Sequence, residues 1–194
     1  MAVLPHGLTV ASQLRPGGQP AAAAIGAVAL AAVLLTPFLG FPQDVTEPAL
    51  KAAYIYNFAL FTEWPAEAVP AAGPLVICMT SDAAIGEALE RAVKNRPIAG
   101  RRITVAPIAP GGSARACHVL YVSGGSASRA KELVSGLRGA PVLTISDVEG
   151  FTELGGIALF FFDQGRLRFS VDIGAAKRAG LVINSRLLTL ARTK

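Results

Sequence analysis

The stretch Leu75-Val76-Ile77-Cys78-Met79, followed by Ser81-Asp82 and a run that ends near Lys94, decides the fold. Five consecutive apolar residues predict a strand that is buried on both faces, which is typical of the inner strands of parallel sheets. Ser81-Asp82 then caps a helix whose apolar residues recur at three- and four-residue steps. A buried strand followed directly by a helix is the building unit of an α/β fold.

The same alternation continues on both sides of this unit. The predicted elements are a helix that begins at Thr46 and is ended by Trp64-Pro65, a helix at 126–137, strands at 103–108, 118–122 and 141–145, a β-hairpin with arms 157–162 and 166–171, and short helices at 172–179 and 185–191. Pro107 and Pro110 place the 103–108 strand at or near a sheet edge, because proline cannot donate to a ladder. The sequence therefore predicts a single α/β domain, with a mixed β-sheet flanked by helices and a C-terminal hairpin with short helices.

Composition excludes several classes of protein. The chain has 194 residues, of which 52% are hydrophobic and 16% charged, so it has enough apolar residues for one folded core. Its net charge is +5, but the basic residues are scattered along the sequence, so nucleic acid is not an expected partner. Two histidines and two cysteines are too few for a three- or four-ligand zinc site built from them alone. We expect no metal and no cofactor.

The N-terminal segment has the composition of an export signal. Residues 1–42 contain no acidic residue and a single basic one, Arg15, followed by the unbroken apolar run Ala21–Leu35. This order predicts an export signal over 1–42 and an exported domain over 43–194. Retention of the run as a membrane anchor stays open, because it approaches the length of about 20 residues that spans a bilayer. Both alternatives predict that the domain is exported.

Two cysteines are the sharpest chemical feature of the exported domain. Cys78 lies in the first predicted strand, and Cys117 comes immediately before the 118–122 strand. In neighbouring strands these positions can reach the Cα separation of about 5.5 Å that a disulfide needs, and export supplies an oxidising compartment. The alternative is two buried free thiols. A disulfide that closes the segment from Cys78 to Cys117 would stabilise the fold by about 3.9 kcal/mol in the chain-entropy treatment.

Other polar residues carry weak signals for catalysis. His118 follows Cys117, and a lone strand histidine is most often a structural or surface residue. A hydrolase using Ser81 or Ser126 with His118 lacks any nucleophile-elbow motif. The turn Gly124–Ser128 opens a helix but lacks both phosphate-binding glycine motifs, so a capped turn is favoured over the binding site of a small-molecule sensor. No catalytic residue is predicted.

One loop and one helix end supply candidate contact residues. Asp147, Glu149 and Glu153 are expected in a solvated loop around Phe151. Because glycine precedes Phe151, we expect its ring to be exposed for contact with a partner. Trp64, at the end of the first helix, is a second candidate contact, although a role in capping the core is equally compatible with its position.

Several strings, in order along the chain, resemble the YfiR (HmsC-like) family. They are Lys51-Ala52-Ala53-Tyr54-Ile55-Tyr56-Asn57-Phe58 with Glu63-Trp64-Pro65, Cys117-His118-Val119-Leu120-Tyr121, Pro141-Val142-Leu143-Thr144-Ile145-Ser146-Asp147 with Gly150-Phe151, Ala179-Gly180-Leu181, and Ser185-Arg186-Leu187-Leu188. The resemblance covers about residues 47–192, essentially the whole exported part.

The resemblance implies a non-enzymatic periplasmic homodimer. Its relatives bind the periplasmic sensor part of an inner-membrane diguanylate cyclase and inhibit it, which lowers cyclic di-GMP and restrains biofilm formation. Inhibition in the family responds to redox state through disulfides, and Cys78 and Cys117 fall where one family pair is expected. Relatives have a second cysteine pair near the segment equivalent to Phe151–Phe160, where this chain has no cysteine. The absence of that pair argues against redox switching but leaves a structural disulfide possible between Cys78 and Cys117. The alternatives are a periplasmic small-molecule sensor and an envelope hydrolase.

Overall fold

A computed structural model describes residues 45–70, 73–80, 82–109 and 111–192. The predicted export signal at 1–42 lies outside these residues. Within the described residues, no helix is both long and apolar enough to cross a membrane.

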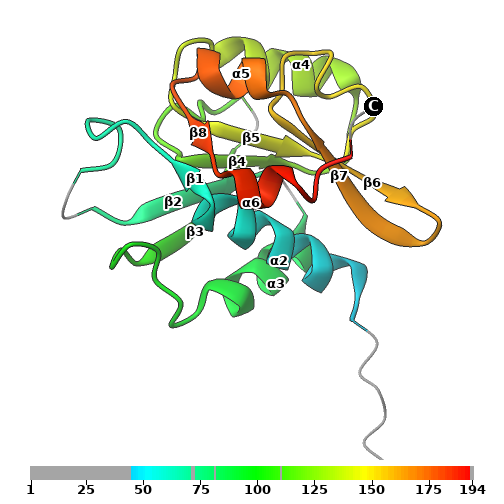
Figure 1. The fold of residues 1–194 in the computed structure, drawn as a ribbon, viewed down its shortest axis with the longest axis horizontal. Helices are drawn as coiled ribbons and strands as arrows, with labels where there is room; N and C mark the ends of the chain where they lie inside the picture. The colour runs from blue at the N-terminus through cyan, green and yellow to red at the C-terminus, as the bar shows by residue number, and fades with distance from the viewer. Residues whose placement is uncertain (1–44, 71–72, 81, 110, 193–194) are drawn as a thin grey trace, which may run out of the picture. The chain divides into compact units, whose positions relative to one another are not determined.

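The centre of the domain is a six-stranded sheet in the order β3-β2-β4-β5-β6-β7 (Figure 1). Its strands are β2 (Leu75–Met79), β3 (Ile103–Pro107), β4 (Val119–Val122), β5 (Leu143–Ser146), β6 (Ala158–Asp163) and β7 (Arg166–Val171). All neighbouring strands are parallel except β6 and β7, which form the antiparallel hairpin. The predicted mixed sheet is confirmed, as is the edge position of β3.

The order in which successive strands join the sheet reverses at β2. After β2 the chain adds β3 on one side, and it then returns to place β4 on the other side of β2. The connections that leave the carboxyl ends of β2 and β4 therefore diverge. In open α/β sheets, ligands bind at such a switch point, in the crevice outside the carboxyl ends of the strands.

Capping side chains start the three longer helices. These are α2 (Glu47–Leu60), α3 (Ala83–Val93) and α4 (Ala127–Gly136). The side-chain oxygens of Thr46, Asp82 and Ser126 each accept a hydrogen bond from a backbone N–H three residues later. The predicted caps at Asp82 and Ser126 are confirmed.

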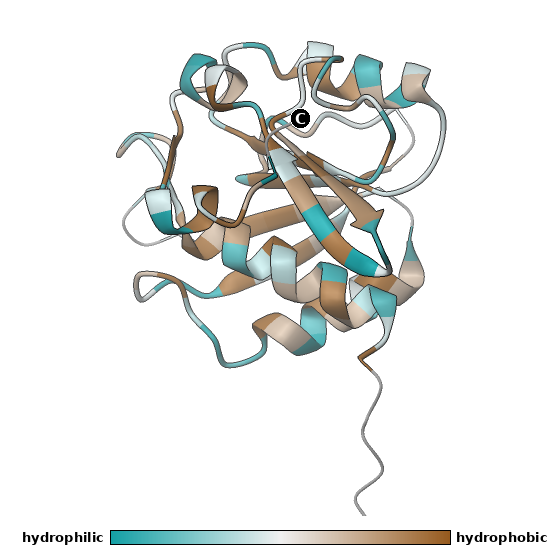
Figure 2. Cartoon of the chain, turned by 45° about the vertical axis from the view of Figure 1, so that its right-hand side comes forward, coloured by the Kyte–Doolittle hydropathy of each residue, from teal (hydrophilic) through white to brown (hydrophobic). Residues whose placement is uncertain are grey.

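Helices cover both faces of the sheet, because successive strand residues point to opposite sides (Figure 1). In β4, Val119 and Tyr121 belong to the buried cluster that contains α2 and α3. Leu120 and Val122, also in β4, belong to a second buried cluster, which contains α4. The central strands are accordingly apolar on both faces, as their colour in Figure 2 shows.

The C-terminal segment ties back to the first helix. It contains α5 (Ile173–Arg178), β8 (Val182–Ile183) and α6 (Ser185–Leu188). The strand β8 pairs antiparallel with β1 (Thr62–Glu63), which directly follows α2. This two-stranded sheet was not predicted, because two residues show no periodicity. With β1 in place, α2 ends at Leu60, earlier than the predicted end at Trp64-Pro65.

Candidate functional site

Cys78 and Cys117 form a disulfide, as predicted. Their Cα atoms are 5.8 Å apart, and each residue is 6% exposed. The bond lies in the buried cluster on the α4 side of the sheet, beside Ala114 and Leu120. It fixes the segment that enters β4 to the middle of β2 and is shielded from solvent.

His118 is a structural residue held by two backbone groups. Its Nδ1 accepts a hydrogen bond from the Val76 N–H at 2.9 Å, and its Nε2 lies 3.2 Å from the carbonyl oxygen of Ala68. An accepting Nδ1 requires the neutral ring with the proton on Nε2. Burial lowers the pKa of His118, and the nearby charge of Arg101 acts in the same direction. The predicted structural role is confirmed.

No described serine is placed to use His118 as a base. Ser126 follows the carboxyl end of β4, whereas His118 precedes its amino end, so the length of the strand separates them. The Ser126 hydroxyl instead bonds the Ser128 hydroxyl at 2.7 Å and caps α4. Ser81 lies outside the described residues. Among those that are described, no three His, Cys, Asp or Glu side chains gather as metal ligands.

Trp64 is half-buried and faces an open hollow at the amino ends of the strands. Its indole N–H donates to the carbonyl oxygen of His118 at 3.2 Å, so the polar end of the ring is satisfied within the fold. The hollow has a volume of about 540 Å³ and is lined by Trp64, Val69, Ile98 and Arg101, among others. We call it the Trp64 hollow. Its partly exposed ring keeps Trp64 a candidate contact residue.

Phe151 is not exposed, and the expectation that its ring is available to a partner is wrong. The residue is 0% exposed and belongs to the α4-side cluster. Its loop folds back through a 3.0 Å bond from the Gly156 N–H to the Phe151 carbonyl oxygen, and the ring lies over Gly156. A Cβ at position 156 would come within 2.1 Å of that ring. The glycine therefore makes room for the burial of Phe151.

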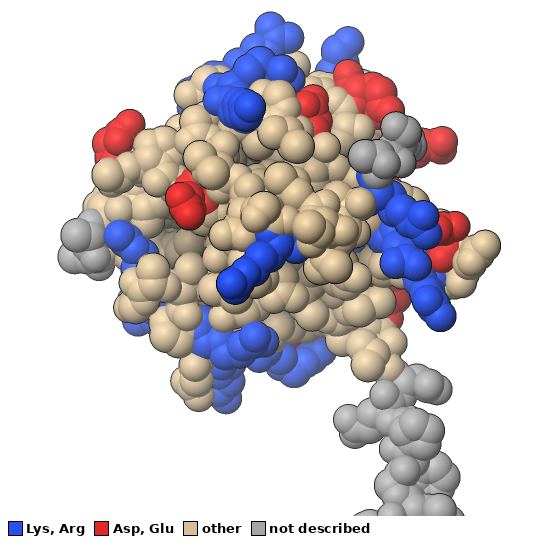
Figure 3. All heavy atoms as spheres, viewed as in Figure 1, with Lys and Arg blue, Asp and Glu red and all other residues tan. Residues whose placement is uncertain are grey.

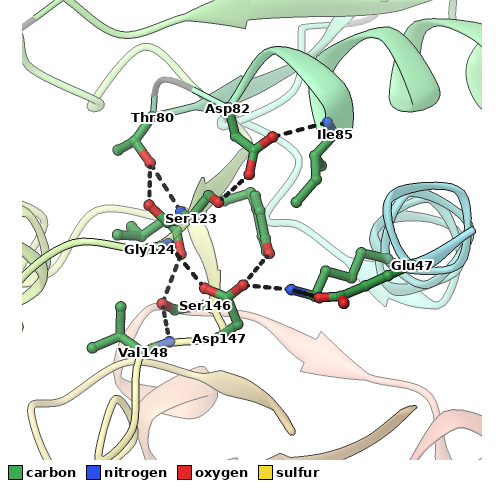
Figure 4. A network of polar contacts seen from close by, with 12 residues as sticks. Glu47, Thr80, Asp82, Ile85, Ser123, Gly124, Ser146, Asp147 and Val148 are labelled. Carbon is green, nitrogen blue, oxygen red and sulfur yellow. Dashed lines mark hydrogen bonds and ion pairs between the residues drawn. The ribbon is translucent and has the colours of Figure 1, made fainter. Parts of the chain in front are cut away.

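A buried ion pair joins the first helix to the carboxyl end of β5. Lys51 is 7% exposed, and its Nζ lies 2.6 Å from Asp147 Oδ2 and 2.6 Å from Glu47 Oε1 (Figure 4). Burial alone would lower the pKa of Lys51, but its bonds to the two carboxylates raise the pKa above its ordinary value. The ammonium group is therefore charged and paired on both sides.

Asp147 accepts hydrogen bonds from α2, from β4 and from the turn that follows β4. Besides Lys51, Tyr121 donates its hydroxyl to Oδ2 at 3.1 Å, and the Gly124 N–H donates to Oδ1 at 3.0 Å. Burial would raise the pKa of Asp147, but Lys51 and these hydrogen bonds outweigh it and lower the pKa. Burial and the charge of Asp147 raise the pKa of Tyr121. The prediction of a solvated loop is therefore wrong for Asp147.

The same network closes the switch point between β2 and β4 (Figure 4). Thr80 exchanges hydrogen bonds with the backbone of Ser123, and the Ser123 hydroxyl donates to Asp82 at 2.6 Å. The Gly124 amide is already bonded to Asp147, and Ser126 caps the Arg129 amide in the first turn of α4. These contacts occupy the Gly124 and Arg129 amides, which reduces the number of donors that the Gly124–Ser128 turn could offer to a small molecule.

An open hollow of about 460 Å³ adjoins the buried ion pair. Its lining includes Lys51, Asp147 and Glu149 together with the hairpin residues Phe160, Phe161, Phe162 and Leu167. Phe162 is 50% exposed, so the exposed aromatic ring of this domain lies on the hairpin rather than at Phe151. We call this site the Phe162 hollow. Sequence reasoning missed Lys51, although its position four residues before the buried Ile55 placed a lysine on an apolar helix face.

Comparison with known proteins agrees with this architecture. The profile of the YfiR/HmsC-like family matches residues 48–192, which is most of the chain. The chain belongs to the YfiR/HmsC-like family. Membership in this family indicates a periplasmic regulator rather than an enzyme.

Among solved structures, the YfiR/HmsC-like chain is similar to a conserved domain protein from Vibrio cholerae O1 biovar eltor str. N16961. The TM-score is 0.51 at 15% sequence identity, over 72% of this chain and 58% of that chain. At this identity the likeness concerns the fold, and the chain spans a little over half of the length of the Vibrio protein. No protein of curated function matches the sequence.

Proposed function

We propose that this chain is a periplasmic inhibitor that binds the periplasmic sensor part of an inner-membrane diguanylate cyclase. By holding the cyclase inactive it would lower cyclic di-GMP and restrain biofilm formation. The observation that carries this proposal is membership in the YfiR/HmsC-like family over residues 48–192. The buried Cys78–Cys117 disulfide supports the periplasmic location, because disulfides persist in oxidising compartments.

The arrangement of the domain suits inhibition by contact. Its polar network is satisfied internally at the switch point, and its exposed aromatic ring, Phe162, borders an open hollow on the hairpin. An inhibitor shifts a two-state receptor only as far as it binds the two states unequally. Moving the receptor from almost fully active to almost fully inactive requires about a 10⁴-fold preference for the inactive state. A rigid surface is favoured for such discrimination, since it cannot adapt to both states.

We place the partner contact on the Phe162 hollow. Phe162 takes the role that sequence reasoning gave to Phe151, whereas Trp64, the second candidate contact residue, lies at a separate hollow. Buried aromatic anchors in pockets supply most of the binding energy in typical interfaces. The chain is also expected to form a homodimer, which light scattering of the exported protein would measure.

The first experiment removes the gene and measures cyclic di-GMP. The proposal expects the nucleotide level to rise in the deletion strain and to return when the gene is restored. Co-purification of the cyclase with the tagged protein from solubilised envelopes is the direct readout. Unchanged nucleotide in a strain that contains an active envelope-sensing cyclase would argue against the function.

A matched pair of surface variants tests the contact residues. Phe162→Ala should weaken co-purification and derepress the cyclase, because it removes an exposed ring beside the hollow. Ile173→Ala is the control, since Ile173 is 47% exposed against 50% for Phe162 but lies on α5. Equal effects of both variants would refute the assignment of the hairpin as the contact surface.

A further inference from the structure

The connection between α3 and β3 concentrates positive charge that is dispersed elsewhere in the chain. Residues 94–102, which we call the basic loop, contain Lys94, Arg96, Arg101 and Arg102 and no acidic residue. None of these four side chains has a carboxylate within ion-pair distance in the described part of the chain. Lys and Arg side chains gather along the lower edge of the face in Figure 3, where Figure 1 places α3 and this loop.

The basic loop is held in one shape. Ile98 is buried and exchanges two backbone hydrogen bonds with Arg101, of 3.0 and 2.9 Å. The guanidinium of Arg96 lies 4.0 Å above the ring of Tyr56, and Arg101 donates to the carbonyl oxygen of Pro70. Arg96 and Arg101 are therefore positioned by the fold before any partner arrives.

An aromatic surface adjoins these charges. Ile98, Ala99 and Arg101 of the basic loop also line the Trp64 hollow. Trp64 is the single tryptophan of the chain, and it is half-buried with its N–H satisfied by His118. Cationic side chains beside a partly exposed tryptophan form the composition that binds the interface of an anionic bilayer.

We propose that the basic loop docks the domain on the anionic surface of a lipid bilayer, with Trp64 at the headgroup level. The inference rests on the proposed function in one respect, since an inhibitor of an inner-membrane cyclase works beside that bilayer. Lipid phosphates complement the positive charge of the loop, whose cations have no carboxylate partner among the described residues. Docking restricts the search for the cyclase to the membrane surface.

Vesicle binding tests the proposal without any cyclase present. The protein purified from the envelope of producing cells is mixed with vesicles of phosphatidylethanolamine containing about one-third phosphatidylglycerol, a surface charge that attracts basic residues. We expect co-sedimentation at low salt that weakens as salt rises, together with a blue shift of the Trp64 fluorescence. Vesicles of phosphatidylcholine alone should not bind.

Two variants with the same change of net charge locate the surface. Lys94→Gln with Arg102→Gln should weaken binding about 25-fold, since each basic residue near the membrane contributes about fivefold. Lys131→Gln with Arg138→Gln, on α4 and just after it, is the control and should change binding less than about threefold. All four side chains are exposed, so neither pair of substitutions should unfold the protein.

Several outcomes would overturn the proposal. If both double variants lost vesicle binding equally, net charge alone would explain the binding. If the protein bound phosphatidylcholine vesicles equally well, charge would have no part in the binding. Absence of binding to either vesicle would remove the docking step while leaving cyclase inhibition to be judged by its own assay. Normal vesicle binding by the Lys94 and Arg102 variant with loss of cyclase inhibition would assign the loop to a protein partner instead.

Discussion

Replacing Cys78 and Cys117 together by alanine should lower the free energy of unfolding by about 5 kcal/mol, most of it from loss of the cross-link. The two residues are 39 positions apart in sequence, and closing a loop of that length removes about 3.9 kcal/mol of conformational freedom from the unfolded chain in the chain-entropy treatment. The double variant is used because a single substitution would leave a reactive thiol. The loss is a large part of the 5–15 kcal/mol, roughly, that stabilises a typical domain.

The folded state adds a smaller contribution to this loss. Both cysteines are 6% exposed and pack in the α4-side cluster, so alanine leaves two small cavities in place of the sulfur atoms. We expect these cavities to cost about 1 kcal/mol in total, by comparison with other small truncations in cores. The unfolded-state effect should therefore dominate.

Urea unfolding followed by the fluorescence of Trp64 measures the difference. The variant should show a lower midpoint and a steeper dependence of free energy on urea, because its unfolded chain is no longer compacted by the cross-link. A loss smaller than about 1 kcal/mol would refute the reasoning, since it would mean that the cross-link hardly restricts the unfolded chain.

Reductant supplies the matched control without any substitution. Because the disulfide is shielded from solvent, the native protein should resist reduction until it unfolds, and reductant in urea should then reproduce the behaviour of the double variant. Rapid reduction of the folded protein, measured by thiol titration, would contradict the structural role of the bond and would favour a redox switch.

Three further perturbations test the core and the polar network. The pKa of His118 is lowered in the folded protein, so the free energy of unfolding should be constant above about pH 6.5 and should fall as the pH drops below that value. His118→Gln should abolish this fall, which urea unfolding at a series of pH values would measure. Lys51→Met should lower the free energy of urea unfolding by about 2 kcal/mol, because it leaves the half-buried carboxylate of Asp147 without its cation. Adding Asp147→Asn to this variant should restore part of the lost stability. Phe151→Ala should cost about 3–5 kcal/mol in thermal or urea unfolding, whereas an exposed ring would cost almost nothing.

The elements of this fold were predictable where side-chain patterns repeat. The continuous apolar run at 75–79 and the period of three to four residues after Asp82 both signal their elements locally, and β2 and α3 lie where expected. The two-residue strands β1 and β8 carry no such signal, because their pairing joins residues about 120 positions apart. The order of the strands is also set by non-local packing, which a single sequence does not display.

The errors at the candidate site have a common physical cause. A glycine before an aromatic residue suggested an exposed loop at Phe151, but a second glycine, Gly156, provides the space into which the ring folds. Asp147 was assigned to solvent because its partner Lys51 is 96 residues away. In both cases the local sequence specified a loop, and a contact with a distant segment decided whether its side chains were buried.

The closed switch point gives a structural reason to favour contact over turnover. In many α/β folds the crevice between the diverging connections holds a ligand, and exposed amides and polar side chains line it. Here Thr80 and Asp82 bond to Ser123 across that crevice, and Asp147 takes the Gly124 amide. Opening the crevice for a ligand would leave several half-buried polar groups without partners, at a cost of about 1–3 kcal/mol each. Phe162, Trp64 and the basic loop lie on the outside instead, where another macromolecule or a bilayer can reach them.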